Sequence, residues 1–293
     1  MISFLSYLVS GISLGSVYAI IALGYTMVYG IAKMLNFAHG DVIMVGGYVS
    51  LLAMSSLGLP WWLALPLAML ACTVLGVVIE GLAYRPLRAA PSLAVLITAI
   101  GVSYLLQNSA LLIFGANPKV YTPIVSGAIK LFDGRLSVSY VSLLTVAACL
   151  VIMAGLTLFT GKSKMGKAMR ACSEDKGAAQ LMGINVNRTI SITFAIGSAL
   201  AAIAGVLLCS SYTSLMPTTG SMPGIKAFTA AVFGGIGSIP GAFLGGILLG
   251  LIESMAKAYI STQLANSIVF AVLIIVLLVR PAGLLGKYVP EKV

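Results

Sequence analysis

The sequence predicts an all-α polytopic membrane protein with about eight transmembrane helices, within a range of about seven to nine. Of its 293 residues, 60% are hydrophobic and only 8% are charged, and the mean hydropathy is +1.09. An ordinary soluble domain carries about 25% charged residues. Because a spanning helix needs about 20 apolar residues, most of the chain would lie in a bilayer as one transmembrane domain, residues 1–293. A soluble enzyme and a disordered chain are both excluded.

In the first half of the chain, apolar runs alternate with polar breaks. We expect spans over residues 5–30, 61–80, 93–114 and 140–159. A polar break at 33–41 leads into a short, glycine-containing apolar segment at 42–57, and a mixed polar loop covers 116–138. The basic loop at 84–88 is predicted to be cytoplasmic by the positive-inside rule.

The second half begins with the longest polar stretch, residues 161–188. It holds six basic and two acidic residues, so we predict that it is cytoplasmic. A span at 189–209 and an external loop at 210–223 follow. A short helix at 225–233 ends in a glycine-rich break, a further helix runs from 241 to about 259, and the last span covers 267–280.

The sequence allows the C-terminus to lie on either side of the membrane. The segment 224–240 could be a full span or a re-entrant half-helix, and the two possibilities place the C-terminus on opposite sides. Arg280, Lys287 and Lys292 favour the cytoplasm. The N-terminus lacks a basic segment and a cleavage site, so we interpret it as the start of an uncleaved first span.

Small residues four apart predict close helix packing, because lipid supplies no hydrophobic force between helices and backbones must approach each other. The sets are Gly11/Gly15, Gly197/Ala201/Gly205, Gly241/Gly245 and Gly246/Gly250.

No catalytic, metal or nucleotide site is expected in this chain. The Gly-Lys-Ser sequence at 161–163 lacks the first glycine of a P-loop, because position 156 is Leu. The four cysteines have no metal-binding spacing, and His39 is the only histidine. The net charge of +10 resides in loops, which suits a bilayer rather than a nucleic acid.

Two features could carry transport. Short, glycine-interrupted apolar segments lie in each half of the chain, near 36–48 and 224–240, and such a pair is typical of a translocation pathway near the midplane. His39 and Asp41 lie in the first of them, and Lys226 lies in the second. Glu80 and Glu253 lie towards the ends of apolar runs, so we interpret them as interfacial or helix-capping charges.

The cytoplasmic loop is predicted to be helical from 165 to 182. The apolar residues of its repeat are Met165, Met169, Cys172, Ala179 and Met182. This amphipathic helix could lie on anionic lipid or dock into a partner's groove.

Four runs of sequence, at 36–41, 170–175, 181–185 and 226–240, closely resemble the high-affinity branched-chain amino acid ABC transporter permeases of the LivH type. The resemblance covers nearly the whole chain. It implies a multi-pass subunit of the bacterial inner membrane that is not itself an enzyme. Its partners would be a second, LivM-like permease, two cytoplasmic ATPases that bind ATP and Mg²⁺, and a periplasmic substrate-binding protein.

The resemblance also implies two sets of site residues. Importer permeases often couple to their ATPases through a Glu-Ala-Ala-x3-Gly core, and residues 177–183 match it at both alanines and the last glycine but not at the Glu. The coupling residues would be Arg170, Glu174, Asp175, Ala178, Ala179, Gly183, Asn185 and Arg188. The translocation pathway would include Asn36, His39, Asp41, Gly46, Gly47, Phe228, Gly234 and Gly235.

Other functions remain in view. Related permeases carry urea, amides or other amino acids, so a permease for one of these substrates is the alternative. A stand-alone secondary transporter would need ion-coupling acids in its spans, and this chain is poor in them. A channel would leave the long basic loop without a role.

Overall fold

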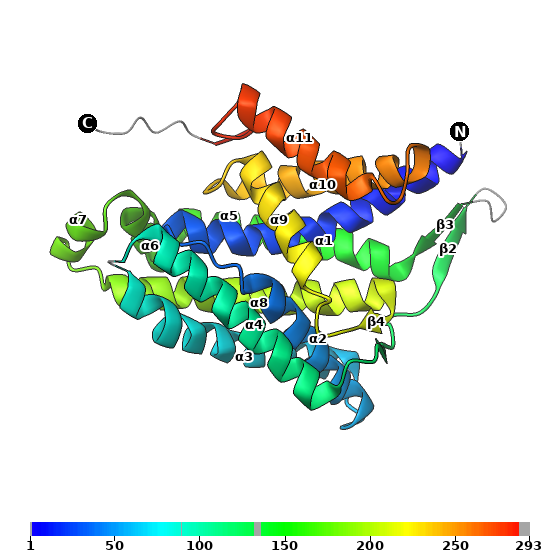
Figure 1. Cartoon of the computed structure of the whole chain (residues 1–293), viewed down its shortest axis with the longest axis horizontal. Helices are drawn as coiled ribbons and strands as arrows, with labels where there is room; N and C mark the ends of the chain where they lie inside the picture. The colour runs from blue at the N-terminus through cyan, green and yellow to red at the C-terminus, as the bar shows by residue number, and fades with distance from the viewer. Residues whose placement is uncertain (1, 89, 132–135, 287–293) are drawn as a thin grey trace.

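The computed structural model describes residues 2–88, 90–131 and 136–286 (Figure 1). Within these ranges, six helices are long and apolar enough to cross a membrane, which confirms the predicted all-α polytopic class. They are α1 (Ile2–Ala32), α3 (Trp61–Ile79, extended to Leu87 by the π-helical η1, Glu80–Tyr84, and the 3-10 turn η2, Arg85–Leu87), α4 (Ser92–Phe114), α5 (Tyr140–Lys162), α8 (Val186–Tyr212) and α10 (Ile239–Tyr259).

Three further helices have only 17, 14 and 15 residues. They are α2 (His39–Ser55), α9 (Ser221–Gly234) and α11 (Ala265–Val279). The last of these has 15 residues, fewer than the about 20 that a straight span needs, so the predicted final span is shorter than a full crossing. Together with the six long helices, these three give a number of membrane segments consistent with the predicted range.

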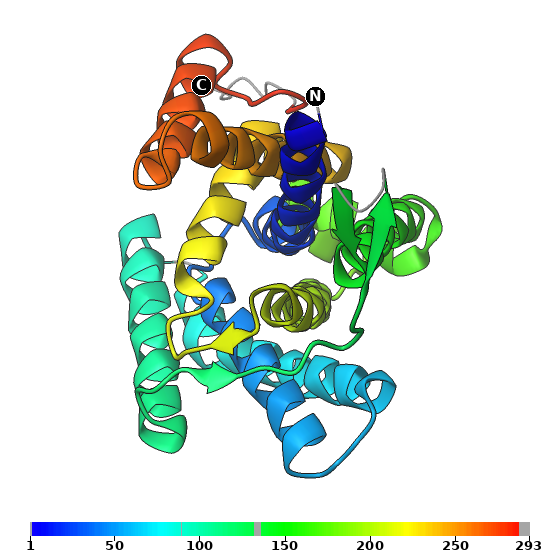
Figure 2. The ribbon, with the colours of Figure 1, turned by 90° about the vertical axis from the view of Figure 1, so that its right-hand side faces the viewer.

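Helices α1 and α10 form an antiparallel pair that crosses the length of the protein (Figures 1 and 2). A Cβ added to Gly11 would lie 3.0 Å from the Leu251 Cα, and one added to Gly15 would lie 2.8 Å from the Ile247 Cα. Only glycine allows backbones to approach this closely. The small-residue spacing therefore predicted this contact correctly.

Short strands gather at one end of the protein, opposite the end that carries α6 (Lys164–Glu174) and α7 (Lys176–Leu181) (Figure 1). β1 (Lys119–Val120) pairs with β4 (Ser214–Leu215), and β2 (Ala128–Leu131) pairs with β3 (Leu136–Ser139). The positive-inside rule predicts that the end with α6 and α7 faces the cytoplasm, so we name it the cytoplasmic end and name the strand-bearing end the external end.

The chain returns to the cytoplasmic end after α11. The amide of Leu284 donates to the Phe233 carbonyl at 2.9 Å, at the end of α9. The turn after α9 also lies against the cytoplasmic end of α1, since a Cβ on Gly30 would lie 3.3 Å from the Gly237 Cα. The described part of the C-terminal segment, which includes Arg280, therefore lies at the same end as α6 and α7, the end predicted to be cytoplasmic. Lys287 and Lys292 lie outside the described residues.

Candidate translocation and coupling sites

Helices α2 and α9 begin inside the protein, and their N-termini meet. A Cβ on Gly40, in the first turn of α2, would lie 2.7 Å from the Gly220 carbonyl oxygen, and one on Gly224 would lie 2.8 Å from the Gly40 Cα. From this junction, α2 runs to the external end and α9 runs to the cytoplasmic end (Figure 1). Residues 213–220 lead in from the external end and α9 leaves at the cytoplasmic end, so this stretch crosses the protein as a broken span. The other predicted possibility, a re-entrant half-helix that returns to the side it came from, is not the one that forms.

A buried carboxylate connects the two helix starts to α4. Asp41 is 2% exposed, and its Oδ1 accepts a hydrogen bond from Gln107 Nε2 at 2.9 Å. The same amide nitrogen lies 3.3 Å from Ser221 Oγ, at the first residue of α9. A carboxylate in the first turn of a helix is favoured by the positive end of the helix dipole. Asp41 was predicted from the sequence, whereas Gln107 was missed because one neutral amide in an apolar span gives little signal.

Other predicted pathway residues surround the junction. The His39 ring is 1% exposed and lies 4.6 Å from the Tyr25 ring, which in turn lies 5.7 Å from Phe228. Asn36 is also buried, and its Oδ1 accepts a hydrogen bond from the Tyr84 hydroxyl at 2.9 Å. The structure therefore brings Asn36, His39 and Phe228 close to the place where the two short helices meet.

The four glycines predicted to lie in the pathway are packed against the backbone or side chains of neighbouring segments. A Cβ on Gly46 would lie 2.7 Å from the Ala202 Cα of α8, and one on Gly47 would lie 3.0 Å from Cys209 Sγ. Gly234 contacts the Gly241 backbone, and Gly235 has a φ of +105°, which L side chains rarely adopt. Gly46 and Gly47 therefore pack α2 against α8, whereas Gly234 and Gly235 lie at the far end of α9, away from the junction, where the chain turns towards α10.

The predicted cytoplasmic helix is two helices. Asp175 has extended backbone angles, φ −152° and ψ 114°, and separates α6 from α7. Its Oδ1 accepts hydrogen bonds from the amides of Gly177 at 2.7 Å and Ala178 at 3.0 Å, which is a helix N-cap. The expectation of one continuous helix from 165 to 182 was therefore wrong, because an acidic side chain in this position starts a new helix.

The exposed side of this segment carries most of the predicted coupling residues. They are Arg170, Glu174, Asp175, Ala178, Gly183, Asn185 and Arg188. Met182, expected on the apolar face, is 82% exposed, as is its neighbour Leu181 at 91%. Ala179 is only 4% exposed and packs inside this chain, so it supports the segment from within instead of offering a contact surface.

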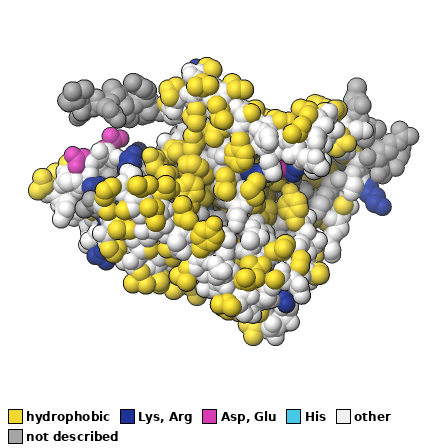
Figure 3. All heavy atoms as spheres, in the orientation of Figure 1, with side chains coloured by type: hydrophobic (Ala, Val, Ile, Leu, Met, Phe, Trp, Pro, Cys, Tyr) yellow, Lys and Arg dark blue, Asp and Glu magenta, His cyan; other side chains and the backbone are white. Residues whose placement is uncertain are grey.

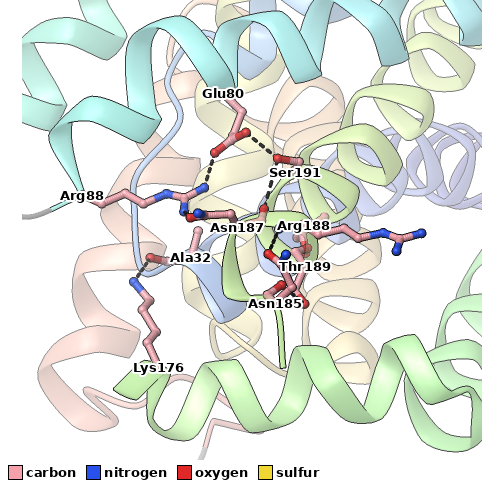
Figure 4. Close-up of polar contacts among 10 residues, drawn as sticks. Ala32, Glu80, Arg88, Lys176, Asn185, Asn187, Arg188, Thr189 and Ser191 are labelled. Carbon is pink, nitrogen blue, oxygen red and sulfur yellow. Dashed lines mark hydrogen bonds and ion pairs between the residues drawn. The ribbon is translucent and has the colours of Figure 1, made fainter. Parts of the chain in front are cut away.

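A lysine joins this segment to the end of α1. Lys176 Nζ donates a hydrogen bond of 2.8 Å to the Ala32 carbonyl (Figure 4). Partial burial lowers the pKa of the Lys176 ammonium, and the positive charges of Arg88 and Lys33 lower it further. Ala32 is the last residue of α1, and residues 33–38 lead directly from it to the start of α2.

A second polar cluster fastens the ends of α3 and α8 at the same level (Figure 4). Arg88 forms an ion pair with Glu80 and a hydrogen bond with Asn187, and Ser191 Oγ donates to Glu80 Oε2 at 2.6 Å. Glu80 is 1% exposed. Glu80 lies at the end of α3, as expected, but its side chain pairs with Arg88 and Ser191 and does not cap a helix. Arg88 lies eight residues away, beyond a π-helical turn that the sequence did not indicate.

Glu253 likewise differs from the expectation. It is 1% exposed, and its Oε1 accepts hydrogen bonds from Lys226 Nζ at 2.7 Å and from Lys257 Nζ at 2.6 Å. It is the centre of a charged cluster between α9 and α10 and does not cap a helix. The partner Lys226 was noticed in the sequence, but the pairing of residues 27 positions apart was not.

Six apolar spans, two opposed half-helices and a cytoplasmic segment fastened to the end of α1 define a multi-pass membrane protein with an interrupted centre, an architecture suited to transport. Residues 7–278 match the family model described as the permease component of branched-chain amino acid transport systems, and the chain belongs to this family.

Several curated relatives match nearly the full length. The chain is 45% identical to the high-affinity branched-chain amino acid transport system permease protein BraD of Pseudomonas aeruginosa, over 99% of this chain and 98% of BraD. It is 46% identical to the corresponding LivH protein of Escherichia coli, over 99% and 98% of the two chains. Among solved structures, PsaBC from Streptococcus pneumoniae in complex with Fab aligns with a TM-score of 0.46 and 15% identity, over 92% of this chain and 88% of that one.

Proposed function

We propose that this chain is a permease subunit of an ATP-driven importer for leucine, isoleucine and valine in the bacterial inner membrane. It would work beside a second, LivM-like permease and receive substrate from a periplasmic binding protein. Membership of the permease family supports this function. The observation that carries the mechanism is the Lys176–Ala32 hydrogen bond, since it connects an exposed cytoplasmic segment to the chain that enters the central junction.

ATP and Mg²⁺ would be bound by two cytoplasmic ATPase subunits, and this chain would bind no cofactor. The sequence supports this division of labour because its only Gly-Lys-Ser lacks the first P-loop glycine. The exposed side of α6 and α7 would seat in the ATPases. There the apolar Leu181 and Met182 would enter a groove, and the charged Arg170, Glu174 and Arg188 would fix the register at its rim.

ATP binding would move this segment, and the movement would pass along two routes. The Lys176–Ala32 bond leads to residues 33–38 and then to His39 and Asp41. The Arg88–Glu80 pair carries the same displacement into α3 and α8. Because a conformational equilibrium shifts only through unequal affinity for its states, the ATPases would have to dock more tightly in one state than in the other.

The pathway would lie between this chain and the second permease, beside the junction of α2 and α9. Irregular backbone at membrane depth is tolerated where it is buried in protein or lines a water-filled cavity. Asn36, His39, Asp41 and Phe228 are the residues that would face this route as the two half-helices move. The binding protein would supply most of the substrate selectivity.

Uptake of radiolabelled leucine into proteoliposomes tests the proposal. The liposomes would contain this chain, its neighbouring permease and the two ATPases, with binding protein outside and ATP inside. Leucine uptake should require both ATP and binding protein. ATP-dependent uptake of urea or an amide but not leucine would change the substrate. Uptake by this chain alone, driven by an ion gradient and indifferent to ATP, would overturn the proposal.

A further inference from the structure

A recess opens at the external half of the protein between α1, α8, α9 and α10. It consists of two adjoining hollows of about 350 Å³ and 250 Å³, which share Leu14, Tyr212 and Lys257 in their walls. Figure 3 shows basic and acidic side chains sunk in this face and surrounded by hydrophobic atoms. Tyr18 and Lys226 line the inner of the two hollows.

The charged groups in this recess do not cancel. Two lysines, Lys226 and Lys257, share one carboxylate oxygen of Glu253, at 2.7 and 2.6 Å. The other oxygen, Oε2, accepts a hydrogen bond from the Tyr18 hydroxyl at 2.9 Å. Two ammonium groups against one carboxylate leave one positive charge on the wall of the recess.

The hydrogen-bonding capacity of the cluster is also uneven. Glu253 accepts from three donors, whereas each lysine ammonium has three N–H groups, of which one goes to Glu253. The side chain of Lys226 is 7% exposed and that of Lys257 is 37% exposed, so Lys257 lies nearer the opening. Spare donors and a net positive charge on the wall of a recess fit an incoming anion.

The rest of the lining suits an amphipathic ligand. Leu14, Leu208 and Met222 supply apolar surface beside the hydroxyls of Tyr212 and Thr219. Small-molecule sites commonly combine an apolar wall with a few placed polar groups. An aliphatic amino acid presents both a carboxylate and an apolar side chain, so it matches both parts of this recess.

We propose that Lys226 and Lys257 form a docking site for the carboxylate of the transported amino acid, between release from the binding protein and passage of the central junction. Glu253 holds the two lysines in place while their remaining N–H groups bind the ligand. Lys226 lies on α9, five residues after Ser221 at the start of that helix, so the site adjoins the junction. The identity of the ligand rests on the proposed function, whereas the recognition of a carboxylate rests on the recess.

Protection of Lys257 from chemical acylation tests the site without requiring transport. The full-length chain, co-reconstituted with its partner subunits in phosphatidylcholine liposomes without ATP, would be treated with a membrane-impermeant succinimidyl ester. Mass spectrometry would then report modification of Lys257 and of the exposed control Lys130 in β2. Millimolar leucine and 4-methylpentanoate, which carry a carboxylate, should protect Lys257 but not Lys130. Leucinol, which lacks the carboxylate, should protect neither lysine.

Equal protection by leucinol, or no protection by any of the three compounds, would overturn the proposal. An anionic lipid headgroup is another source of the same chemistry. If phosphatidylglycerol in the liposomes protects Lys257 and leucine adds nothing, the site holds lipid and the proposal fails.

Uptake measurements on variants separate this inference from the proposed function. Lys257→Gln should lower the rate of ATP-dependent leucine uptake about tenfold or more, because it removes a charge-assisted hydrogen bond to the substrate. Lys257→Arg should restore most of the rate, and Lys130→Gln should leave it unchanged. Wild-type uptake with an unimpaired Lys257→Gln variant would refute the docking site alone. If the wild-type complex takes up no leucine while carboxylates still protect Lys257, the proposed importer function is refuted and the proposed docking site stands.

Discussion

The contact between α2 and α9 can be tested by adding a single methyl group. In Gly224→Ala, the new Cβ would lie 2.8 Å from the Gly40 Cα, where an ordinary carbon–carbon contact is about 3.5–4.0 Å. The two helix starts would have to separate by roughly 1 Å. Since both sides of the contact are backbone, no side chain can turn away to relieve it. Overpacking of this kind costs about 1–3 kcal/mol.

Alanine also has an advantage over glycine within a helix, of about 1 kcal/mol, so the effect of Gly224→Ala alone would underestimate the clash. Gly155→Ala in α5 is the matched control, because a Cβ there meets nothing within 4 Å. Both variants gain the same propensity. The difference between their free energies of unfolding should therefore isolate the clash, at about 1–3 kcal/mol.

The assay is reversible unfolding of the purified chain in mixed micelles, with leucine uptake measured in parallel. We expect Gly155→Ala to match or exceed the wild type in stability and to transport normally. Gly224→Ala should be less stable than Gly155→Ala and should transport more slowly. If the two variants have the same free energy of unfolding, the two half-helices do not touch at Gly40, and the described contact between α2 and α9 is refuted.

Three other substitutions probe the polar groups and the cytoplasmic segment. Glu80→Ala should lower the free energy of unfolding by about 3–5 kcal/mol in the same micelle assay, because it leaves the Arg88 charge without its partner. A double variant that lacks both charges should recover part of this loss. A cost near zero would contradict a buried ion pair. Asp41→Asn keeps an acceptor for the Gln107 amide but removes a negative charge that stabilises by up to about 2 kcal/mol near helix N-termini. The rate of leucine uptake should therefore fall about tenfold or more while the fold is retained. Unchanged uptake would argue against a role for the charge. Ala179→Trp cannot fit its buried position and should abolish uptake while the protein still inserts in the membrane, so undiminished uptake would count against the coupling role of α7.

The long spans were predictable because a bilayer imposes a simple rule of length and apolarity. The expected span at 93–114 lies within one residue of α4, Ser92–Phe114. The helix starting at 140 begins at the expected residue and ends three residues later than expected, at Lys162. Small residues such as Gly11 and Gly15 also predicted the packing face of α1, since no other residue type allows that approach.

The polar contacts were less predictable because they join distant parts of the chain. Asp41 and Gln107 are separated by 66 residues, and Lys176 and Ala32 by 144. Hydropathy describes each segment alone, so it placed Glu80 and Glu253 near helix ends without finding the lysines and arginine that neutralise them. The break at Asp175 could have been recognised from the sequence, because an acidic side chain ahead of small residues is a common helix start.

The two half-helices leave two stretches of non-helical chain beside the junction, residues 33–38 on its cytoplasmic side and 213–220, which include β4, on its external side. Amides in the long spans donate helical hydrogen bonds, so their hydrogens exchange with deuterium only when the helix unfolds locally. Amides in these two stretches are less protected: Lys33 and Thr213 bond back to the helices before them, and Met216 and Thr219 bond only within their own turn. Each stretch is therefore a natural reporter of water arriving from its own side, and hydrogen–deuterium exchange timed through a cycle would show which side opens first.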